Sequence, residues 1–334
     1  MRAFLVDRYG SRGGLRVGEV PDPEVGANDV LVRVRAASVN PLDLMIRAGK
    51  MKAVLPYRLP LILGNDLAGT VVRVGAAVTR FAVGDEVYAR PGKDRIGTFA
   101  EFIAVHQDDL AIKPATLSME EAASLPLVAL TSWQVLVERA RVQPGQKVLI
   151  HAGSGGLGTI AIQLAKQLGA QVATTTSTGN VDVVKSLGAD VVVDYKTQAF
   201  ETVLHDYDVV LDALGGETLK KSLDVLRPGG KVISVAGPPD AAFGRELGAN
   251  PLIRLAMSAL SFPIRRRARR RGVTYSFLFM KADGDQLREF TALIDAGEIR
   301  PVIDAVFPFE STPEALEYVA AGRAKAGKVV VQMR

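Results

Sequence analysis

The chain contains no cysteine, and this absence excludes disulfides, a thiolate nucleophile and any metal site with cysteine ligands. Histidine is scarce as well: only His106, His151 and His205 occur, and none is spaced from another as metal ligands are, so no metal is expected. No run approaches the roughly 20 apolar residues of a membrane span, and the first residues lack the apolar stretch of a secretory signal. We therefore expect a cytoplasmic protein.

Positive charge is concentrated in one window of the chain. The formal net charge is +5, and six arginines lie within residues 265–271. Subtracting these six leaves a net charge of −1 for all other residues, so the basicity is local. Nucleic-acid binding is not expected, because it requires basic residues over a broader surface.

At 334 residues the chain exceeds one average domain, and its pattern changes near residue 118. Up to about residue 115, short alternating or β-branched runs are separated by Gly and Pro, which is typical of a small antiparallel barrel. From residue 118 onward helical and strand patterns alternate, which indicates a parallel sheet with crossover helices. The expected strands are 147–152, 171–176, 191–193, 208–212, 231–235, 275–279, 302–307 and 328–331, and the expected helices are 156–168, 181–187, 216–226, 284–296 and 313–321. Residues 237–273 are expected to be irregular.

A glycine-rich loop joins the strand that ends near residue 150 to the helix that follows it. Gly153, Gly155 and Gly158 fit the pattern G-x-G-x-x-G, which carries the pyrophosphate of a dinucleotide. The first glycine permits a tight turn, the second lets the backbone approach the phosphates, and the third lets the helix pack on the strand. The helix N-terminus adds unpaired N–H groups and the positive end of its dipole. The loop therefore predicts a dinucleotide-binding oxidoreductase.

The end of the second strand of this unit favours NADP(H) over NAD(H). NAD-selective units place an acid about 20 residues past the glycines, to hold the ribose 2′-hydroxyl. Here the strand at 171–176 is followed by Ser177 and Asn180, and no acid occurs before Asp182. Hydroxyls and an amide can donate to a 2′-phosphate, which a carboxylate would repel. No arginine stands at this strand end, and the same residues would also cap the next helix.

Four ordered motifs precede the glycine loop, at residues 38–43, 63–71, 81–87 and 122–133. With the loop, they resemble the zinc-independent quinone oxidoreductase and alkenal/enone reductase branch of the medium-chain dehydrogenase/reductase superfamily, over essentially the full chain. Zinc-dependent relatives carry Cys near the position of Asn40, and Gly-His-Glu where this chain has Gly64, Asn65 and Asp66. They also carry a four-cysteine lobe that is missing here. The resemblance thus implies no zinc, in agreement with the cysteine count.

The resemblance implies an α/β fold with two domains. A GroES-like, mostly antiparallel β-barrel catalytic domain would span residues 1–117, with 298–334 returning to it. A Rossmann domain with a doubly wound parallel sheet would span 118–297, including an arginine-rich insertion near 245–272. A homodimer is also implied.

Asn40 would lie beside the nicotinamide and the substrate carbonyl, and it is the one catalytic residue that the resemblance implies. The residues implied to bind NADP(H) are Asn40, Thr131, Gly153, Ser154, Gly155, Gly156, Leu157, Gly158, Ser177, Asn180, Tyr195, Leu214, Gly237, Phe279 and Lys328. Asn180 departs from the lysine that is common at its position in quinone reductases. Ordinary packing of Thr131 and Tyr195, and a turn amide at Asn40, are the structural alternatives.

The expected reaction is direct hydride transfer from the nicotinamide to a quinone or to the C=C bond of an α,β-unsaturated carbonyl. Asn40 is expected to polarise the carbonyl as a neutral donor, and the proton to come from solvent, since no general acid is assigned. One alternative is a zinc-free carbonyl or alcohol dehydrogenase. The other is a non-catalytic NADPH-binding sensor or membrane-associated scaffold.

Residues 252–271 join an apolar segment to the arginines. The apolar positions 252, 253, 256, 257 and 260 follow a helical stripe. We favour a lid over the substrate site or a dimer-facing helix with a solvated basic end. Peripheral contact with an anionic membrane surface is the second interpretation.

Overall fold

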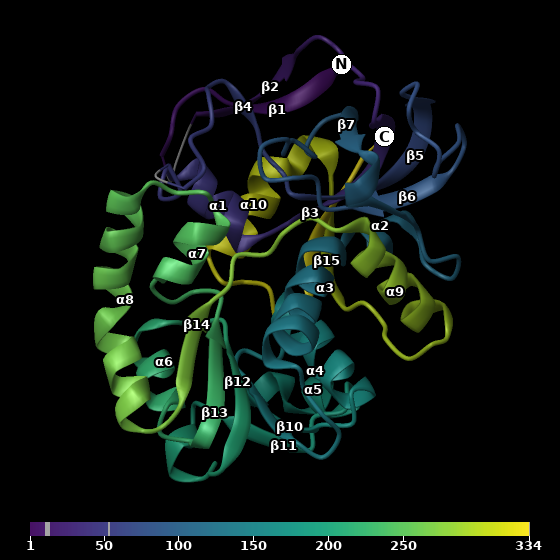
Figure 1. The fold of residues 1–334 in the computed structure, drawn as a ribbon. Coiled ribbons are helices and arrows are strands. Elements are labelled where there is room, and N and C mark those ends of the chain that lie inside the picture. The colour runs from purple at the N-terminus through teal and green to yellow at the C-terminus, as the bar shows by residue number, and fades with distance from the viewer. Residues whose placement is uncertain (11–13, 53, 334) are drawn as a thin grey trace. The chain divides into compact units, whose positions relative to one another are not determined.

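A computed structural model of the protein describes residues 1–10, 14–52 and 54–333. The chain divides into two compact units (Figure 1). Unit 1 comprises Met1–Leu130 and Lys281–Arg334, and unit 2 comprises Thr131–Met280.

These bounds differ from the expected domain limits at residues 117 and 298, because the flanking helices pack on unit 1. Helix α2 (Met119–Ala123) lies on strand β3 (Asp29–Val39), and helix α9 (Gly284–Asp295) lies on strand β8 (Leu110–Ile112). Both helices therefore belong with the antiparallel sheet rather than with unit 2.

Unit 1 is built on β-strands. One sheet has the order β15-β16-β3-β5-β6-β8, with β7 paired to β3, and a smaller sheet has the order β2-β1-β4. Neighbouring strands are antiparallel, except that β15 and β16 run parallel. In β3 the exposed Arg33 and Arg35 alternate with buried valines, which is the two-residue period of a strand. The predicted mostly antiparallel β domain is confirmed.

The other elements of unit 1 are the strands β1 (Arg2–Val6), β2 (Leu15–Glu19), β4 (Leu61–Ile62), β5 (Asp66–Val74), β6 (Glu86–Ala89), β7 (Phe102–His106), β15 (Ile303–Pro308) and β16 (Lys328–Gln332), the helices α1 (Pro41–Arg47) and α10 (Thr312–Ala320), and the single turns η1 (Gln107–Asp109) and η5 (Phe309–Ser311). The division between the units falls within α3 (Pro126–Trp133).

Unit 2 contains a parallel sheet of order β11-β10-β9-β12-β13-β14. The chain enters at β9 in the middle, winds outward to β11, and then returns to add β12, β13 and β14 on the other side. This is a doubly wound order, so the predicted Rossmann-type sheet is confirmed. The strands are β9 (Lys147–Ile150), β10 (Gln171–Thr176), β11 (Val191–Asp194), β12 (Tyr207–Asp212), β13 (Leu226–Ser234) and β14 (Thr274–Phe277). The helices are α4 (Gly156–Gln167), α5 (Val181–Ser186), α6 (Gly216–Ser222), α7 (Ala241–Glu246) and α8 (Pro251–Arg270), together with the seven-residue π-helix η2 (Gln134–Ala140) and the single turns η3 (Thr178–Asn180) and η4 (Phe200–Thr202).

The stretch 237–273, expected to be irregular, contains the two helices α7 and α8. Each begins at a side-chain cap: Asp240 Oδ1 accepts from the backbone N of Phe243, and Asn250 Oδ1 accepts from that of Ile253, both at 2.9 Å. An exposed Pro263 lies inside α8 without ending it. No helix in the described ranges combines the length and apolar character that a membrane span requires.

Candidate functional site

The glycine loop lies at the carboxyl end of β9, between β10 and β12, and leads into α4. This is where the winding of the sheet reverses, and α/β sheets bind ligands at such a point. Gly155 is the N-cap of α4, and no side chain within the described ranges caps it. The N–H groups of the first turn of this 12-residue helix therefore fit the diphosphate of a dinucleotide.

The three glycines of the motif are needed for different structural reasons. A Cβ at Gly153 would lie 2.0 Å from Thr174 Oγ1 on β10, and one at Gly158 would lie 2.4 Å from the carbonyl oxygen of Ala152. Packing of the loop on β10 and of α4 on the loop therefore requires these two glycines. A Cβ at Gly155 would approach Ala152 O at 3.3 Å, a milder contact, so this glycine is the one that keeps the ligand side open.

The tight turn itself is made by Ala152, whose φ is 55°, and not by the first glycine as the motif suggests. Left-handed backbone is uncommon for alanine. The Ala152 N–H donates to Thr175 Oγ1 at 3.2 Å, which ties this strained residue to β10.

Small polar side chains meet beyond the ends of β9 and β10. Ser154 Oγ accepts from Thr176 Oγ1 and from Asn180 Nδ2, both at 3.1 Å. The Asn180 amide also donates to Ser177 Oγ at 3.3 Å. The structure thus brings together Ser154, Ser177 and Asn180, which the sequence predicted as cofactor contacts. Their hydroxyl and amide groups can donate to a phosphate or a ribose oxygen.

An acid next to this cluster was not anticipated. Asp194 ends β11, and its oxygens accept from Thr178 Oγ1 at 2.6 Å and from the backbone N of Lys196 at 3.0 Å. The hydrogen bond from Thr178 lowers the pKa of Asp194. A search along β10 and its loop could not find this acid, because the pairing of Thr176 with Asp194 brings it from the neighbouring strand.

The remaining predicted contacts of unit 2 also follow parallel strands. Tyr195, Leu214, Gly237 and Phe279 come after β11, β12, β13 and β14, so they share the carboxyl edge of the sheet with the glycine loop. Tyr195 and Leu214 are exposed, Gly237 N donates to Ser234 Oγ at 2.7 Å, and the Phe279 ring lies 5.9 Å from that of Phe243. Gly156 and Leu157 open α4, and Thr131 is buried in α3.

Asn40 lies in unit 1, in a buried polar cluster at the start of α1. Its Oδ1 accepts from Lys328 Nζ at 2.6 Å, while its Nδ2 donates to Asp66 Oδ2 at 2.9 Å and to the Ser38 carbonyl at 3.5 Å. Because an ammonium group can only donate, the amide is oriented with Oδ1 toward Lys328. Donation to a substrate carbonyl, as predicted, would require Asn40 to exchange one of these bonds.

Asp66 connects this cluster and is fully buried. Its Oδ2 also accepts from Ser38 Oγ at 2.7 Å and from Lys328 Nζ at 3.2 Å, and its Oδ1 accepts from the backbone N of Leu127 at 2.8 Å. Lys328 begins β16, and the antiparallel pairing of the next residue with Val39 sets it opposite Asn40. Lys328 was predicted as a cofactor contact. In the structure its side chain is 7% exposed and donates to Asp66 and Asn40.

Asp43 completes the cluster. It accepts from the backbone N of Asn40 and from Asn65 Nδ2, both at 2.7 Å, and burial raises its pKa to about 6. Sequence reasoning gave no role to Asp43 or Asp66, although a carboxylate within an apolar run signals a buried partner. Among the residues that the structure describes, no group of three or more His, Cys, Asp or Glu is arranged to hold a metal ion.

His151, the residue directly after β9, connects the start of the glycine loop to β10 and α6. Its Nε2 lies 2.9 Å from Ser222 Oγ and its Nδ1 lies 3.1 Å from Thr175 Oγ1. Ser222 donates its only hydrogen to the carbonyl of Thr218, so Nε2 carries the imidazole proton and Nδ1 accepts. Burial lowers the pKa of His151 to about 4. The ring is therefore a neutral structural group.

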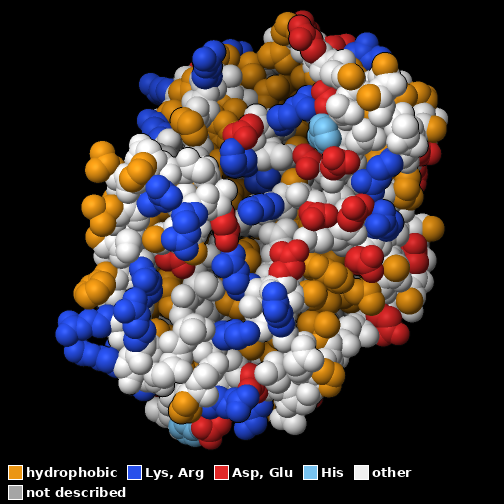
Figure 2. Space-filling view, in the orientation of Figure 1, with side chains coloured by type: hydrophobic (Ala, Val, Ile, Leu, Met, Phe, Trp, Pro, Cys, Tyr) orange, Lys and Arg blue, Asp and Glu red, His pale blue; other side chains and the backbone are white. Residues whose placement is uncertain are grey.

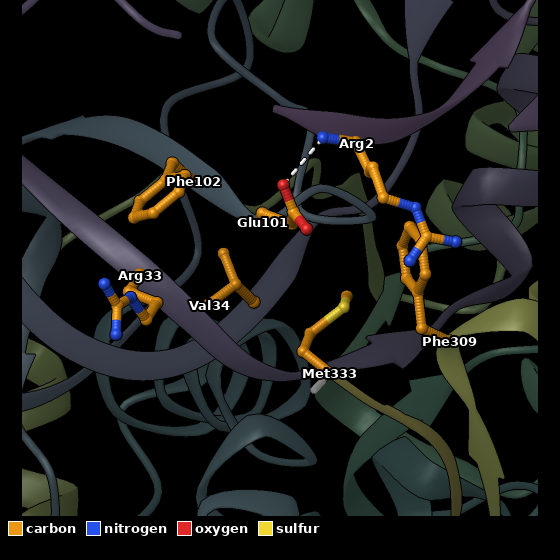
Figure 3. Close-up of a pocket in the computed structure, with 7 residues that line it drawn as sticks. All are labelled: Arg2, Arg33, Val34, Glu101, Phe102, Phe309 and Met333. Carbon is orange, nitrogen blue, oxygen red and sulfur yellow. Dashed lines mark hydrogen bonds between the residues drawn. The ribbon is translucent and has the colours of Figure 1, made fainter. Parts of the chain in front are cut away.

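A cavity of about 250 Å³ in unit 1 is lined by Arg2, Arg33, Val34, Glu101, Phe102, Phe309 and Met333 (Figure 3). Arg2 N donates to Glu101 Oε2 at 2.7 Å, and the two guanidinium groups lie over aromatic rings, Arg2 over Phe309 and Arg33 over Phe102. The cavity contains none of the predicted site residues: its Glu101 carboxylate accepts from the backbone N–H of Arg2, and its two guanidinium groups lie over the rings.

Two known domain families match the chain. Residues 26–115 match the alcohol dehydrogenase GroES-like domain, and residues 187–331 match the zinc-binding dehydrogenase family. The mitochondrial NAD(P)H oxidoreductase RTN4IP1 of Danio rerio is 35% identical, over 100% of this chain and 91% of the relative. The chloroplastic NADPH-dependent alkenal/one oxidoreductase of Arabidopsis thaliana is 34% identical, over 99% of this chain and 79% of the relative. Among solved structures, the quinone oxidoreductase of Coxiella burnetii superposes with a TM-score of 0.87 at 31% identity, covering 100% of this chain and 99% of that one.

Proposed function

Because the chain belongs to the quinone and alkenal/one oxidoreductase branch of the medium-chain dehydrogenase/reductase superfamily, we propose that it is an NADPH-dependent reductase of quinones or enones. In an enone, the reduced bond would be the C=C bond conjugated to the carbonyl. The observation that carries the proposal is the row of polar, glycine and aromatic residues along the carboxyl edge of the parallel sheet of unit 2. That edge begins at the N-terminus of α4, which no side chain of the described residues caps and which suits a diphosphate.

The reduced nicotinamide supplies the hydride when it is bound. In unit 2, the backbone of Gly153 to Gly158 and the hydroxyl of Ser154 would hold the diphosphate, and Ser177 and Asn180 the ribose side. In unit 1, the Lys328 ammonium is a fixed positive charge held at Asn40 and Asp66. Fixed charge of this kind stabilises negative charge that develops on an acceptor oxygen or rests on a cofactor phosphate. No residue is assigned as general acid, and solvent supplies the proton.

We propose NADP(H) rather than NAD(H), on the hydroxyl and amide donors of Ser154, Ser177 and Asn180. The Asp194 carboxylate is engaged by Thr178 and by the Lys196 backbone. A carboxylate so engaged has fewer lone pairs to offer a ribose hydroxyl.

We also propose that the enzyme works without zinc. Asn40, Asn65 and Asp66 stand where zinc-dependent relatives carry Cys and His-Glu, and amide groups are poor zinc ligands. Lys328 already supplies a positive charge at this place, because its ammonium group donates to Asn40 and Asp66. A cytoplasmic location, a homodimer and a peripheral membrane contact through residues 252–271 complete the proposal.

The test follows the absorbance of NADPH, and separately of NADH, against a panel of quinones, enones and aldehydes. We expect oxidation of NADPH by at least one quinone or enone, and a lower KM for NADPH than for NADH. Reduction of NADP⁺ by alcohols would favour a carbonyl or alcohol dehydrogenase. Tight NADPH binding without oxidation by any acceptor would favour a sensor or scaffold, and either result would replace the proposed function.

A further inference from the structure

Helix α8 presents an apolar surface to solvent. Its buried side consists of Met257, Ser261, Ile264 and Ala268. Of the stripe predicted from the sequence, only Met257 is buried, whereas Leu252 is 77% exposed and Leu260 is 60% exposed. Leu255 and Phe262 are exposed as well, at 67% and 54%. Large exposed apolar side chains that gather on one helix mark an interaction surface.

The same face of α8 becomes basic toward its carboxyl end. Positions 252, 255, 259, 262, 266 and 269 are spaced by three or four residues, so they form one continuous row along the helix. The row is apolar up to Phe262 and continues with Arg266 and Arg269, both exposed. Figure 2 shows hydrophobic side chains at the left edge of the view, over α8 of Figure 1, and Lys and Arg side chains below them.

Not every arginine of the cluster is available. Arg267 and Arg271 form ion pairs with Asp224, at 3.1 and 2.6 Å. Arg266, Arg269 and Arg270 are exposed, and residues 251–270 include no acid that could neutralise them. The basic half of the face therefore projects uncompensated charge, in line with the apolar half.

We propose that this face of α8, hereafter the α8 face (Leu252, Leu255, Phe262, Arg266, Arg269 and Arg270), docks on an anionic lipid bilayer. The leucines and Phe262 would enter the boundary between headgroups and acyl chains, and the arginines would bind lipid phosphates. A bilayer supplies both an apolar layer and a negatively charged layer, which are the two surfaces that this face can bind. The α8 face thereby gives the proposed membrane contact a defined surface and a defined lipid charge.

A second copy of the chain fits the α8 face less well. In a two-fold dimer the same patch meets itself, so the arginines of one copy face either arginines or leucines of the other. Neither arrangement supplies a negative charge, and like charges brought together oppose association. The charge of the face therefore selects anionic lipid over self-association.

The experiment measures co-sedimentation of the full chain with vesicles of phosphatidylcholine alone and of phosphatidylcholine mixed with phosphatidylserine. We expect binding to the anionic vesicles, release on raising the salt concentration, and little binding to the neutral ones. The triple variant Arg266→Gln, Arg269→Gln, Arg270→Gln should bind about a hundredfold more weakly, since each basic residue near an anionic surface contributes about a factor of five. The double variant Leu252→Gln, Leu255→Gln should also lose binding.

Matched controls separate the surface from net charge and general hydrophobicity. The variant Arg58→Gln, Arg73→Gln, Arg323→Gln removes three exposed arginines elsewhere, and Val83→Gln removes an exposed apolar side chain elsewhere. Both should bind like the wild type. Equal weakening by the control arginine triple, equal sedimentation with both vesicles, or no binding at low salt would overturn the proposal. So would a dimer in analytical ultracentrifugation that Leu252→Gln, Leu255→Gln dissociates. Because no step needs turnover, this result is independent of the acceptor panel.

Discussion

At the scale of single residues, hydrogen bonds can fix the protonation state of a buried titratable group. His151 shows this most clearly. Both of its ring nitrogens are bonded, to Ser222 and Thr175, and Phe200 packs edge-on at 4.7 Å. A second proton on the ring would have to displace the Thr175 hydroxyl hydrogen, in a site that burial already makes unfavourable for charge. The ring therefore stays neutral while the chain is folded.

This argument predicts an acid sensitivity that depends on His151. The unfolded chain takes up the imidazole proton near pH 6.5, whereas the folded chain resists it until about pH 4. The contribution of neutral His151 to the free energy of unfolding is fully present above pH 6.5. As the pH falls toward 4, this free energy decreases by about 3 kcal/mol in total. We expect the free energy of unfolding in urea to fall by that much more in the wild type than in His151→Gln. Parallel pH profiles of the two proteins would contradict the assignment, and a nitrogen-detected NMR titration of His151 reads its tautomer directly.

The residue pairings of unit 1 could not be predicted from the sequence. Asn40 and Lys328 were each singled out, but their bond joins positions that are 288 residues apart. It depends on the register between β3 and β16, which an apolar run such as 329–331 does not determine because both of its faces are buried. Asp43 and Asp66 lie within the motifs at residues 38–43 and 63–71, yet their role as acceptors for buried donors follows only from the packing.

At the scale of elements, the loop between β9 and α4 shows why one motif uses glycine for two purposes. Gly153 and Gly158 are close to other parts of the protein, whereas Gly155 faces the open N-terminus of α4. Substitutions at these positions should therefore separate folding from cofactor binding.

We expect Gly158→Ala to lower the thermal midpoint, because its Cβ would meet backbone atoms at 2.4 and 2.6 Å that cannot move independently. Overpacking of this kind costs about 1–3 kcal/mol. Gly155→Ala should leave the midpoint within a degree or two while raising the KM for NADPH about tenfold, since the methyl group projects where a phosphate approaches. Gly179→Ala, with no neighbour within 4 Å and no positive φ, is the control. Equal loss of stability in Gly155→Ala and Gly158→Ala would show that both glycines are structural.

Most elements could be read from the sequence because their signals are local. The expected helix 156–168 is α4 at 156–167, and the expected strand 171–176 is β10 with the same ends. Such segments combine a clear period with turn residues at both ends. Helix α8 was missed as a continuous element because its apolar side faces solvent, Pro263 interrupts it, and arginines complete it. A periodic pattern shows which side is apolar, but not whether a neighbour covers that side.

At the scale of the whole molecule, we expect the protein to use a fixed lysine side chain, and not a metal ion, as the positive charge near Asn40. A chain of 334 residues without cysteine has three histidines, and one of them, His151, is bonded at both ring nitrogens. At the place where zinc-dependent relatives bind their metal, Lys328 donates to Asn40 and Asp66. A divalent ion there would have to displace the ammonium from Asp66, and beside that carboxylate it would meet the amides of Asn40 and Asn65, which have low affinity for zinc.

We therefore expect dialysis against a strong zinc chelator to change neither the rate of NADPH oxidation nor the thermal midpoint. Elemental analysis of the purified protein should find far less than one zinc ion per chain, and added zinc should not raise the rate. Lys328→Met is the informative variant, because it leaves Asp66 buried without its cation, a change that typically costs about 3–5 kcal/mol. Lys328→Arg should recover much of that stability, since it restores the charge in the same cluster. Stoichiometric zinc, or a rate that a chelator abolishes and zinc restores, would show that the lysine does not replace the metal. The thermal midpoint answers this question even for a protein that turns over no acceptor.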